Sequence, residues 1–321
     1  MTLMTQESPR TPIPEPPRVA GLVNERLLGI GGRCAVWQVR RQDSGTSGCL
    51  WVSGGDIVPE VLALKVPLAS PRSAPAAHSL RAELDAMLPL AHPHLVRAWG
   101  IALDTGRGGR GLLLDSAAAG SLASMIARTG RLTPSQLVTA LSPVADACAH
   151  LHAQGAAHGD ISAANILLTP EGRPVLADLG DAHLLGMGEQ DHDAEQDVRA
   201  LARVAWRALT GEEPGEGRRR TPLQVICPDV MDGLADLLEQ CLELPDSEVP
   251  QAGEFAAELY ACAAPEPLDL CAQADDAVLA EVPTVLPGHL RATDAERRRR
   301  GTLVGAVSAL RRLLMRARLR A

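Results

Sequence analysis

The chain has 321 residues, which is enough for one large or two modest domains with a substantial hydrophobic core. Aromatic residues make up only 2% of it, so the core must be built mainly from leucine, valine and alanine. The seven cysteines are scattered without a CxxC pair, which argues against a disulfide framework or a zinc site and favours reduced, buried thiols. No signal peptide and no apolar run of roughly 18 residues is present, so we expect a cytoplasmic protein.

The first third of the chain is predicted to be rich in β-strands. Residues 1–20 contain five prolines and are predicted to form a disordered arm. Residues 22–66 have a strand-like pattern, and we expect a Gly/Ser-rich insertion at residues 41–56 to lengthen one hairpin. A short apolar run at residues 111–115 predicts one more buried strand.

The remainder is predicted to be mainly helical. Residues 78–90 repeat at helical spacing and place Glu83 and Met87 on one face. Thr133 followed by Pro134 is a helix-start signal. Further helices are predicted over residues 121–129, 133–154, 195–209, 230–242 and 251–262.

The C-terminal part combines an acidic linker with a basic tail. The net charge of the chain is −8, yet residues 291–321 hold ten arginines against Asp294 and Glu296. Residues 302–318 form a basic amphipathic pattern, which suits an anionic membrane surface such as the inner membrane face, a protein partner, or the acidic body of the chain itself. The tail lacks aromatics and a recognisable nucleic-acid motif, so we do not expect nucleic-acid binding.

A single lysine, Lys65, stands against thirty arginines. Its ammonium is a compact point charge, whereas guanidinium is a wide planar fork, so a narrow phosphate-binding cleft can require the lysine. Ahead of it, Gly29, Gly31 and Gly32 would let backbone N–H groups approach phosphate oxygens closely. Such a loop by itself is also a common hairpin connection, so it carries weight only with the motifs that follow.

Those motifs occur in a particular order: a helical Glu83, a His-Pro-His segment at residues 91–96, a His-Gly-Asp segment at residues 158–167, and an Asp-Leu-Gly segment at residues 175–180. Together they resemble the protein kinase family, in particular bacterial serine/threonine kinases, over about residues 22–262. The resemblance implies a two-lobed α+β fold. A small lobe of antiparallel sheet with one helix would span residues 21–117 and a larger, mainly helical lobe residues 118–263, with the linker and tail at residues 264–321.

The resemblance also implies a role for each motif. Lys65 would hold the α- and β-phosphates of ATP, and Glu83 would hold Lys65 in place. Asp160 would accept the proton of the attacking hydroxyl. Asn165 and Asp178 would bind Mg²⁺ or Mn²⁺, consistent with the preference of these ions for hard oxygen ligands. The partners implied are ATP and a protein substrate.

For adenine, the resemblance implies a pocket between Val36 and Ala63 above and Leu167 below. The backbone from Asp115 to Ala117 would read the adenine edge, and Leu114 takes the gatekeeper position. A buried column of Met87, His158 and Leu179, anchored near Asp197, would align the lobes. Plain core packing explains these apolar residues equally well.

Three departures from the family pattern bear on activity. Gly159 replaces the usual arginine between the histidine and aspartate, and no Ser, Thr or Tyr lies between Asp178 and Asp197. Control by loop phosphorylation is therefore not expected. Ser162 occupies the position where serine/threonine kinases carry a γ-phosphate lysine, and Ala164 the position where tyrosine kinases carry an arginine.

Three functions remain open on these residues. The first is an ATP-dependent protein kinase, Ser/Thr-directed. The second is a pseudokinase that binds nucleotide or acts as a scaffold, which the missing cation favours. The third is a small-molecule kinase, because aminoglycoside and choline phosphotransferases share the His-Gly-Asp tripeptide.

Overall fold

The computed structural model describes residues 15–31, 34–42, 48–51, 57–68, 74–104, 109–179, 183–184, 193–215 and 220–270. Gly32 and the whole basic tail lie outside these ranges, so the predictions made for them stay predictions. Within the ranges, none of the helices combines the length and the apolar character that crossing a membrane requires.

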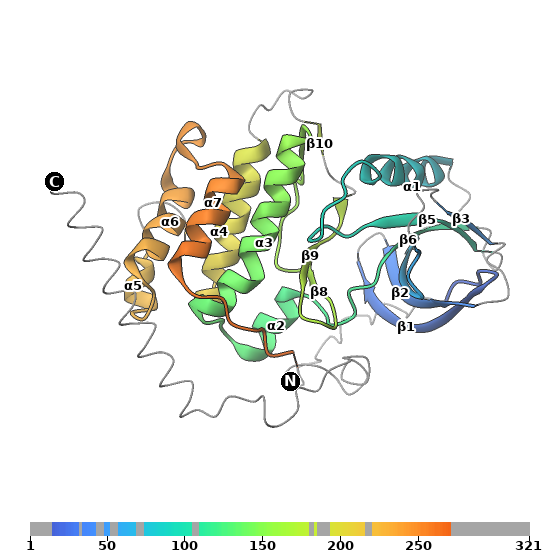
Figure 1. Ribbon diagram of the computed structural model, residues 1–321, viewed down its shortest axis with the longest axis horizontal. Helices are drawn as coiled ribbons and strands as arrows, with labels where there is room; N and C mark the ends of the chain where they lie inside the picture. The colour runs from blue at the N-terminus through green and yellow to red at the C-terminus, as the bar shows by residue number, and fades with distance from the viewer. Residues whose placement is uncertain are drawn as a thin grey trace, which may run out of the picture. The chain divides into compact units, whose positions relative to one another are not determined.

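Six strands form one antiparallel sheet in the order β1-β2-β4-β6-β5-β3 (Figure 1). The period of two along β4 places Leu64 in the hydrophobic cluster of one face and Lys65 on the opposite face. The helix α1 packs beside β5 and β6. The bounds are β1 (Leu22–Ile30), β2 (Cys34–Arg41), β3 (Cys49–Trp51), β4 (Val61–Pro67), β5 (Ala98–Asp104), β6 (Gly109–Asp115) and α1 (Ala74–Met87).

The insertion at residues 41–56 lies in the connection between the antiparallel neighbours β2 and β4, so it lengthens this hairpin as predicted. The sequence did not predict that the strand β3 within the insertion pairs with β5, at the opposite edge of the sheet from β1. Gly100 of β5 permits this pairing, because a Cβ there would collide with the carbonyl oxygen of Leu50. The Cys49 side chain is buried in the core of the sheet, and this burial stabilises β3 in its place beside β5. A Gly/Ser-rich composition carries no register information, and the sequence pattern therefore missed the strand.

The helical lobe follows β6 (Figure 1). Two short antiparallel strand pairs, β7 with β10 and β8 with β9, accompany its helices. The helices α3, α4 and α7 pack against one another. The bounds are α2 (Leu122–Thr129), α3 (Pro134–Ala153), β7 (Ala156–Ala157), β8 (Ile166–Leu168), β9 (Pro174–Leu176), β10 (His183–Leu184), α4 (Asp193–Thr210), α5 (Leu223–Ile226), α6 (Asp232–Glu243) and α7 (Ala252–Cys262).

Capping explains why the helices α2 and α3 begin where the sequence predicts. Thr133 accepts a hydrogen bond from the backbone of Gln136, whose side chain in turn accepts one from the backbone of Thr133. Pro134 occupies the first turn, where its missing N–H costs nothing. Ser121 and Ser124 form the equivalent capping box at α2. Each cap contributes about 1 kcal/mol to helix stability.

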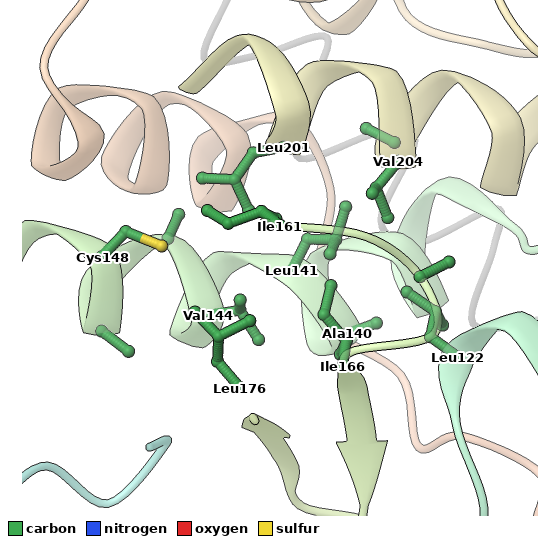
Figure 2. Close-up of a cluster of buried hydrophobic side chains, with 14 of the residues drawn as sticks. Leu122, Ala140, Leu141, Val144, Cys148, Ile161, Ile166, Leu176, Leu201 and Val204 are labelled. Carbon is green, nitrogen blue, oxygen red and sulfur yellow. The ribbon is translucent and has the colours of Figure 1, made fainter. Parts of the chain in front are cut away.

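One hydrophobic core supports the segment that carries Asp160 (Figure 2). Val144 and Cys148 of α3 lie in this core with Ile161, Leu176 and Leu201, all nearly inaccessible to solvent. Full burial of one such aliphatic side chain contributes roughly 1.5–3 kcal/mol. The loop after β7 therefore lies on a rigid base formed by α3, α4 and β9.

The described cysteines are all free thiols, as the scattered spacing predicts. Burial raises the pKa of Cys49 to about 11 and, assisted by the charge of Glu258, that of Cys241 to about 12. These thiols stay protonated near neutral pH and behave as small apolar side chains.

The segments just before and just after the two expected lobes also pack against the folded body. In the segment assigned to the arm, Pro17 and Val19 are buried, and Asn24 donates to the Pro17 carbonyl. In the segment assigned to the linker, Leu270 is buried, and the Thr139 hydroxyl donates to the Glu266 carbonyl over 2.6 Å. Residues 15–20 and 264–270 thus contribute to the folded body.

Candidate active site

Lys65 joins three elements of the chain. Its Nζ lies 2.8 Å from Oε1 of Glu83 on α1 and 2.7 Å from Oδ1 of Asp178, which follows β9. The Lys65 and Glu83 side chains are 15% and 10% exposed, whereas that of Asp178 is 45% exposed. Burial alone would lower the pKa of Lys65, but the charges and hydrogen bonds of both carboxylates outweigh it and raise that pKa to about 12. Lys65 is therefore a cation at neutral pH, on the face of the sheet from which it reaches Glu83 and Asp178.

Asp178 has an unusual backbone. Its φ of 67° lies in the left-handed region, which non-glycine residues adopt rarely and mostly at functional sites. The preceding Ala177 N–H donates to the Asn165 carbonyl over 2.8 Å, and the following Leu179 is buried in the main core. The chain is thus held on both sides of Asp178, and the strained turn directs its carboxylate to Lys65.

Asp160 is exposed, and Asn165 holds it. The Asn165 amide nitrogen donates to the Asp160 backbone carbonyl over 2.8 Å and to Oδ2 of the same residue over 2.9 Å. The backbone of the loop closes with a hydrogen bond from the Asn165 N–H to the Ser162 carbonyl. A carboxylate held in this way, open to solvent, can accept a proton from an incoming hydroxyl.

Asp197 of α4 fixes the start of this loop. Only 1% exposed, it accepts hydrogen bonds from the backbone N–H groups of His158 (2.8 Å) and Gly159 (2.9 Å). The His152 ring lies 2.9 Å from the same carboxylate. Gly159 has a φ of 77°, so the glycine found in place of the usual arginine adopts this turn without strain.

His158 connects the loop to the Asp178 turn. Its Nε2 lies 3.0 Å from the Ala177 carbonyl, so we assign the ring proton to that nitrogen. Burial lowers the pKa of His158, and the nearby carboxylates of Asp197, Asp160 and Asp178 only partly oppose this. The histidine is therefore neutral near pH 7 and serves as a fixed hydrogen-bond donor between the segment of Asp160 and that of Asp178.

The expected adenine residues also come together. Ala117 is buried in a small cluster with Val96 and Val175, against which Leu114 and Leu167 pack. On the sheet, Val36 lies opposite Lys65 and Ala63 opposite Leu114. In the glycine-rich turn, the Gly31 N–H donates to the Cys34 carbonyl over 2.8 Å. Gly29 pairs with Val36 of β2, and Ile30 is the last paired residue of β1 before the turn.

Sequence reasoning missed several side chains that hold the site. Trp99 Nε1 donates to Asp115 over 2.7 Å, and Arg26 of β1 donates to the Ala118 carbonyl over 3.0 Å. The His152 ring contacts the Asp197 carboxylate. No motif marks these residues, and only their contacts across long sequence separations reveal them.

The oxygen donors fit a magnesium ion. Asp178 and Asn165 supply hard carboxylate and amide oxygens on adjacent turns, the kind of ligand that Mg²⁺ prefers. Across the described ranges, His, Cys, Asp and Glu side chains nowhere form a cluster of three that could hold a metal on their own. Magnesium sites of nucleotide enzymes need only one or two carboxylates, because phosphates and waters complete the shell.

A family model described as protein tyrosine and serine/threonine kinase matches residues 29–212, more than half of the chain. The chain belongs to this protein kinase family. The predictions of the family and of the two-lobed α+β kinase fold are therefore confirmed. The matched range begins in the glycine-rich turn and contains Lys65, Glu83, Asp160, Asn165, Asp178 and Asp197.

Bacterial serine/threonine-protein kinases are among the proteins similar to this chain. The serine/threonine-protein kinase PkaA of Streptomyces coelicolor is 30% identical over 201 residues, covering 61% of this chain and 35% of the relative. The serine/threonine-protein kinase PknA of Mycobacterium tuberculosis is 27% identical over 267 residues, covering 72% and 59%. The cytokinesis protein sepH of Aspergillus terreus is 36% identical over 103 residues, covering 32% and 8%. The chain thus spans about one third to three fifths of the two bacterial relatives.

Proposed function

We propose that this protein is an ATP-dependent protein kinase that transfers the γ-phosphoryl group of Mg·ATP to a serine or threonine hydroxyl. The observation that carries the proposal is the contact of Lys65 with both Glu83 and Asp178, beside the loop in which Asn165 holds Asp160. Phosphoryl transfer depends mainly on positioning and charge neutralisation, and these residues supply both.

In this proposal, each group has one task. Lys65 binds the α- and β-phosphates, and Glu83 keeps it oriented. Asp178 and Asn165 would hold the magnesium ion, which neutralises phosphate charge when bound. Asp160 orients the acceptor hydroxyl and takes its proton.

In this proposal, backbone N–H groups of the glycine-rich turn would contact the phosphates, and apolar side chains with the backbone after β6 would contact the adenine. The residues concerned are Gly29, Gly31, Val36, Ala63, Leu114, Asp115, Ala117 and Leu167, together with Gly32, which lies outside the described residues.

A pseudokinase is the second candidate, and Ser162 is the residue that favours it. The sequence provides no lysine at residue 162 and no arginine at residue 164 to neutralise the γ-phosphate. Loss of one preorganised donor of this kind costs about 10²–10³ in rate. The proposal therefore predicts a slow enzyme. A small-molecule acceptor rests only on the tripeptide that begins at His158, and the family match and the bacterial relatives favour a protein acceptor.

The test is to incubate the purified full-length protein with ATP and Mg²⁺ or Mn²⁺ and to follow phosphate incorporation by intact mass and ATP hydrolysis. Asp160→Asn should abolish transfer and leave nucleotide binding unchanged. Asp236→Asn, on an exposed position of α6, is the matched control and should retain activity.

Each other outcome points to a different function. Binding of Mg·ATP without phosphate transfer would establish the pseudokinase. ATP consumption that only aminoglycosides, amino alcohols or sugars stimulate would establish the small-molecule kinase. Equal transfer by wild type and Asp160→Asn would contradict the catalytic assignment itself.

A further inference from the structure

The segment that follows β6 is fastened by side-chain contacts at both ends. At its start, the Asp115 carboxylate accepts a hydrogen bond from Trp99 Nε1 over 2.7 Å and one from the Arg97 backbone N–H over 3.2 Å. The Asp115 N–H returns a hydrogen bond to the Arg97 carbonyl over 2.9 Å. At its end, the guanidinium of Arg26 donates to the Ala118 carbonyl.

Trp99 is itself held rigidly. Its indole is 8% exposed and lies in the hydrophobic cluster on the face of the sheet that also contains Leu64 and Leu113. The guanidinium of Arg97 stacks on the ring, 4.2 Å from its centre. A buried indole N–H requires a polar partner, and here that partner is the carboxylate of Asp115. Because Trp99 is packed in the core, its hydrogen bond to Asp115 holds the start of the segment in a fixed position.

The backbone of this segment is the part that the proposed function assigns to the adenine edge. Recognition of a base by hydrogen bonds depends strongly on the positions of the donors and acceptors. A site built for the donor–acceptor pattern of one base leaves polar groups unpaired when a different base binds. A small displacement of Asp115 would therefore weaken adenine binding and reduce its preference over guanine. Contacts to the triphosphate, which involve Lys65 and the glycine-rich turn, would stay as they are.

We propose that Trp99 is a positioning residue for nucleotide selectivity, which acts through Asp115 on the adenine-reading backbone. The inference rests on the proposed function, since it deepens the role of the same nucleotide site. Trp99 touches neither Lys65 nor Asp178 in this arrangement; it acts on the base and not on the phosphates.

The sheet offers a matched control for the experiment. Trp51 of β3 is a second tryptophan beside an arginine, half-buried where Trp99 is buried, with the guanidinium carbon of Arg41 at 5.5 Å from its ring centre. It lies on the strand at the far edge of the sheet, paired with β5 and away from β6. Trp99→Phe and Trp51→Phe each remove an indole N–H, but only that of Trp99 contacts Asp115, at the start of the segment that follows β6.

The dissociation constants of Mg·ATP, Mg·GTP and magnesium tripolyphosphate are measured for full-length wild type, Trp99→Phe, Trp51→Phe and Asp115→Asn. We expect Trp99→Phe to weaken ATP binding about tenfold, to bring the ATP and GTP constants closer together, and to leave tripolyphosphate binding unchanged. Asp115→Asn, which keeps one side-chain acceptor, should fall between wild type and Trp99→Phe. Trp51→Phe should match wild type.

Hydrogen exchange of the amides of residues 115–118 in nucleotide-free protein gives a second readout, and Trp99→Phe should accelerate it while Trp51→Phe should not. Unchanged exchange together with an unchanged ATP/GTP ratio in Trp99→Phe would overturn the inference. An equal loss of all three ligands would also overturn it, because that indicates only general destabilisation. If wild type binds no nucleotide, the proposed function fails, and the exchange rates still decide whether Trp99 holds the segment.

Discussion

The two halves of the candidate active site hold their key carboxylates in different ways. Glu83 depends on one partner from another element, the flexible cation of Lys65. Asp197 is nearly inaccessible and accepts two backbone N–H groups of the loop that it supports, with His152 as a third neighbour.

This difference indicates which half is preformed. Backbone donors cannot turn away, so the loop from His158 to Asn165 keeps its shape whenever the helical lobe is folded. The Lys65–Asp178 contact joins residues 113 positions apart, and Asp178 is nearly half exposed. We therefore expect the helical half of the site to determine stability and the sheet half to respond to the nucleotide.

Asp197→Asn should have the largest effect. Asparagine replaces one of the two carboxylate oxygens by an NH2 group, so either the His158 or the Gly159 backbone N–H would face a donor and remain buried and unpaired. We expect a loss of about 3 kcal/mol in the free energy of unfolding, measured by urea titration. Asp236→Asn should lose almost nothing, and equal stability of the two variants would contradict the claim that Asp197 holds the loop.

Glu83→Gln should have a smaller effect on stability and a clear one on activity. The amide can still accept a hydrogen bond from Lys65 but carries no charge, so Lys65 will turn toward Asp178. We expect a loss of about 1 kcal/mol in unfolding free energy and at least a tenfold drop in phosphoryl transfer. If activity follows stability alone, the pair is structural and not part of the site.

The pH dependence should reveal the neutral His158. Its pKa is lowered in the folded state, mainly by burial, whereas in the unfolded chain it lies near 6.5. The contribution of neutral His158 to the free energy of unfolding is therefore fully present above about pH 6.5. It falls as the pH drops below that value, because the histidine then binds a proton in the unfolded chain more readily than in the folded protein. His92, whose pKa burial also lowers, contributes in the same direction.

Urea midpoints between pH 7.5 and 5.5 measure this loss. His92→Gln provides the comparison, since it removes one of the two described histidines with a lowered pKa and leaves the loop of Asp160 intact. The variant should show a shallower decline than wild type. A stability that rises toward pH 5.5 would contradict the assignment of both histidines as neutral.

Arg81→Gln should have the smallest effect. Arg81 and Asp85 form an exposed ion pair one turn apart on α1, with side chains 63% and 51% exposed. Such pairs contribute less than about 0.5 kcal/mol. A thermal melt of the variant should overlay that of wild type, which would show that α1 matters to the site through Glu83 and not through its surface charges.

Local patterns predicted the regular elements well where caps and periodicity mark them. The sequence predicted a helix at residues 133–154, and α3 spans residues 134–153 because Thr133 and Pro134 begin it. The predicted helix at residues 78–90 is instead α1 over residues 74–87, because helical spacing identifies a helix without fixing its two ends. The strand β3 was missed altogether, because its pairing depends on a close approach at Gly100 that lies about fifty residues away.

The candidate site shows the same division. The order of motifs was sufficient to select Lys65, Glu83, Asp160, Asn165 and Asp178, and the structure brings them together in two linked groups. The left-handed turn at Asp178, the contact of His152 with Asp197 and the hydrogen bond from Trp99 to Asp115 could not be predicted. Each depends on where distant segments meet.

The sequence by itself determined the identity of the chemical groups and the type of most elements, because residue type and local periodicity act over a few neighbouring positions. Only the tertiary structure decided the partners: Asp178 as the second partner of Lys65, Trp99 as the support of Asp115, and β5 as the neighbour of β3. These contacts join residues that are far apart along the chain, and their geometry is settled when the sheet and the helical core pack.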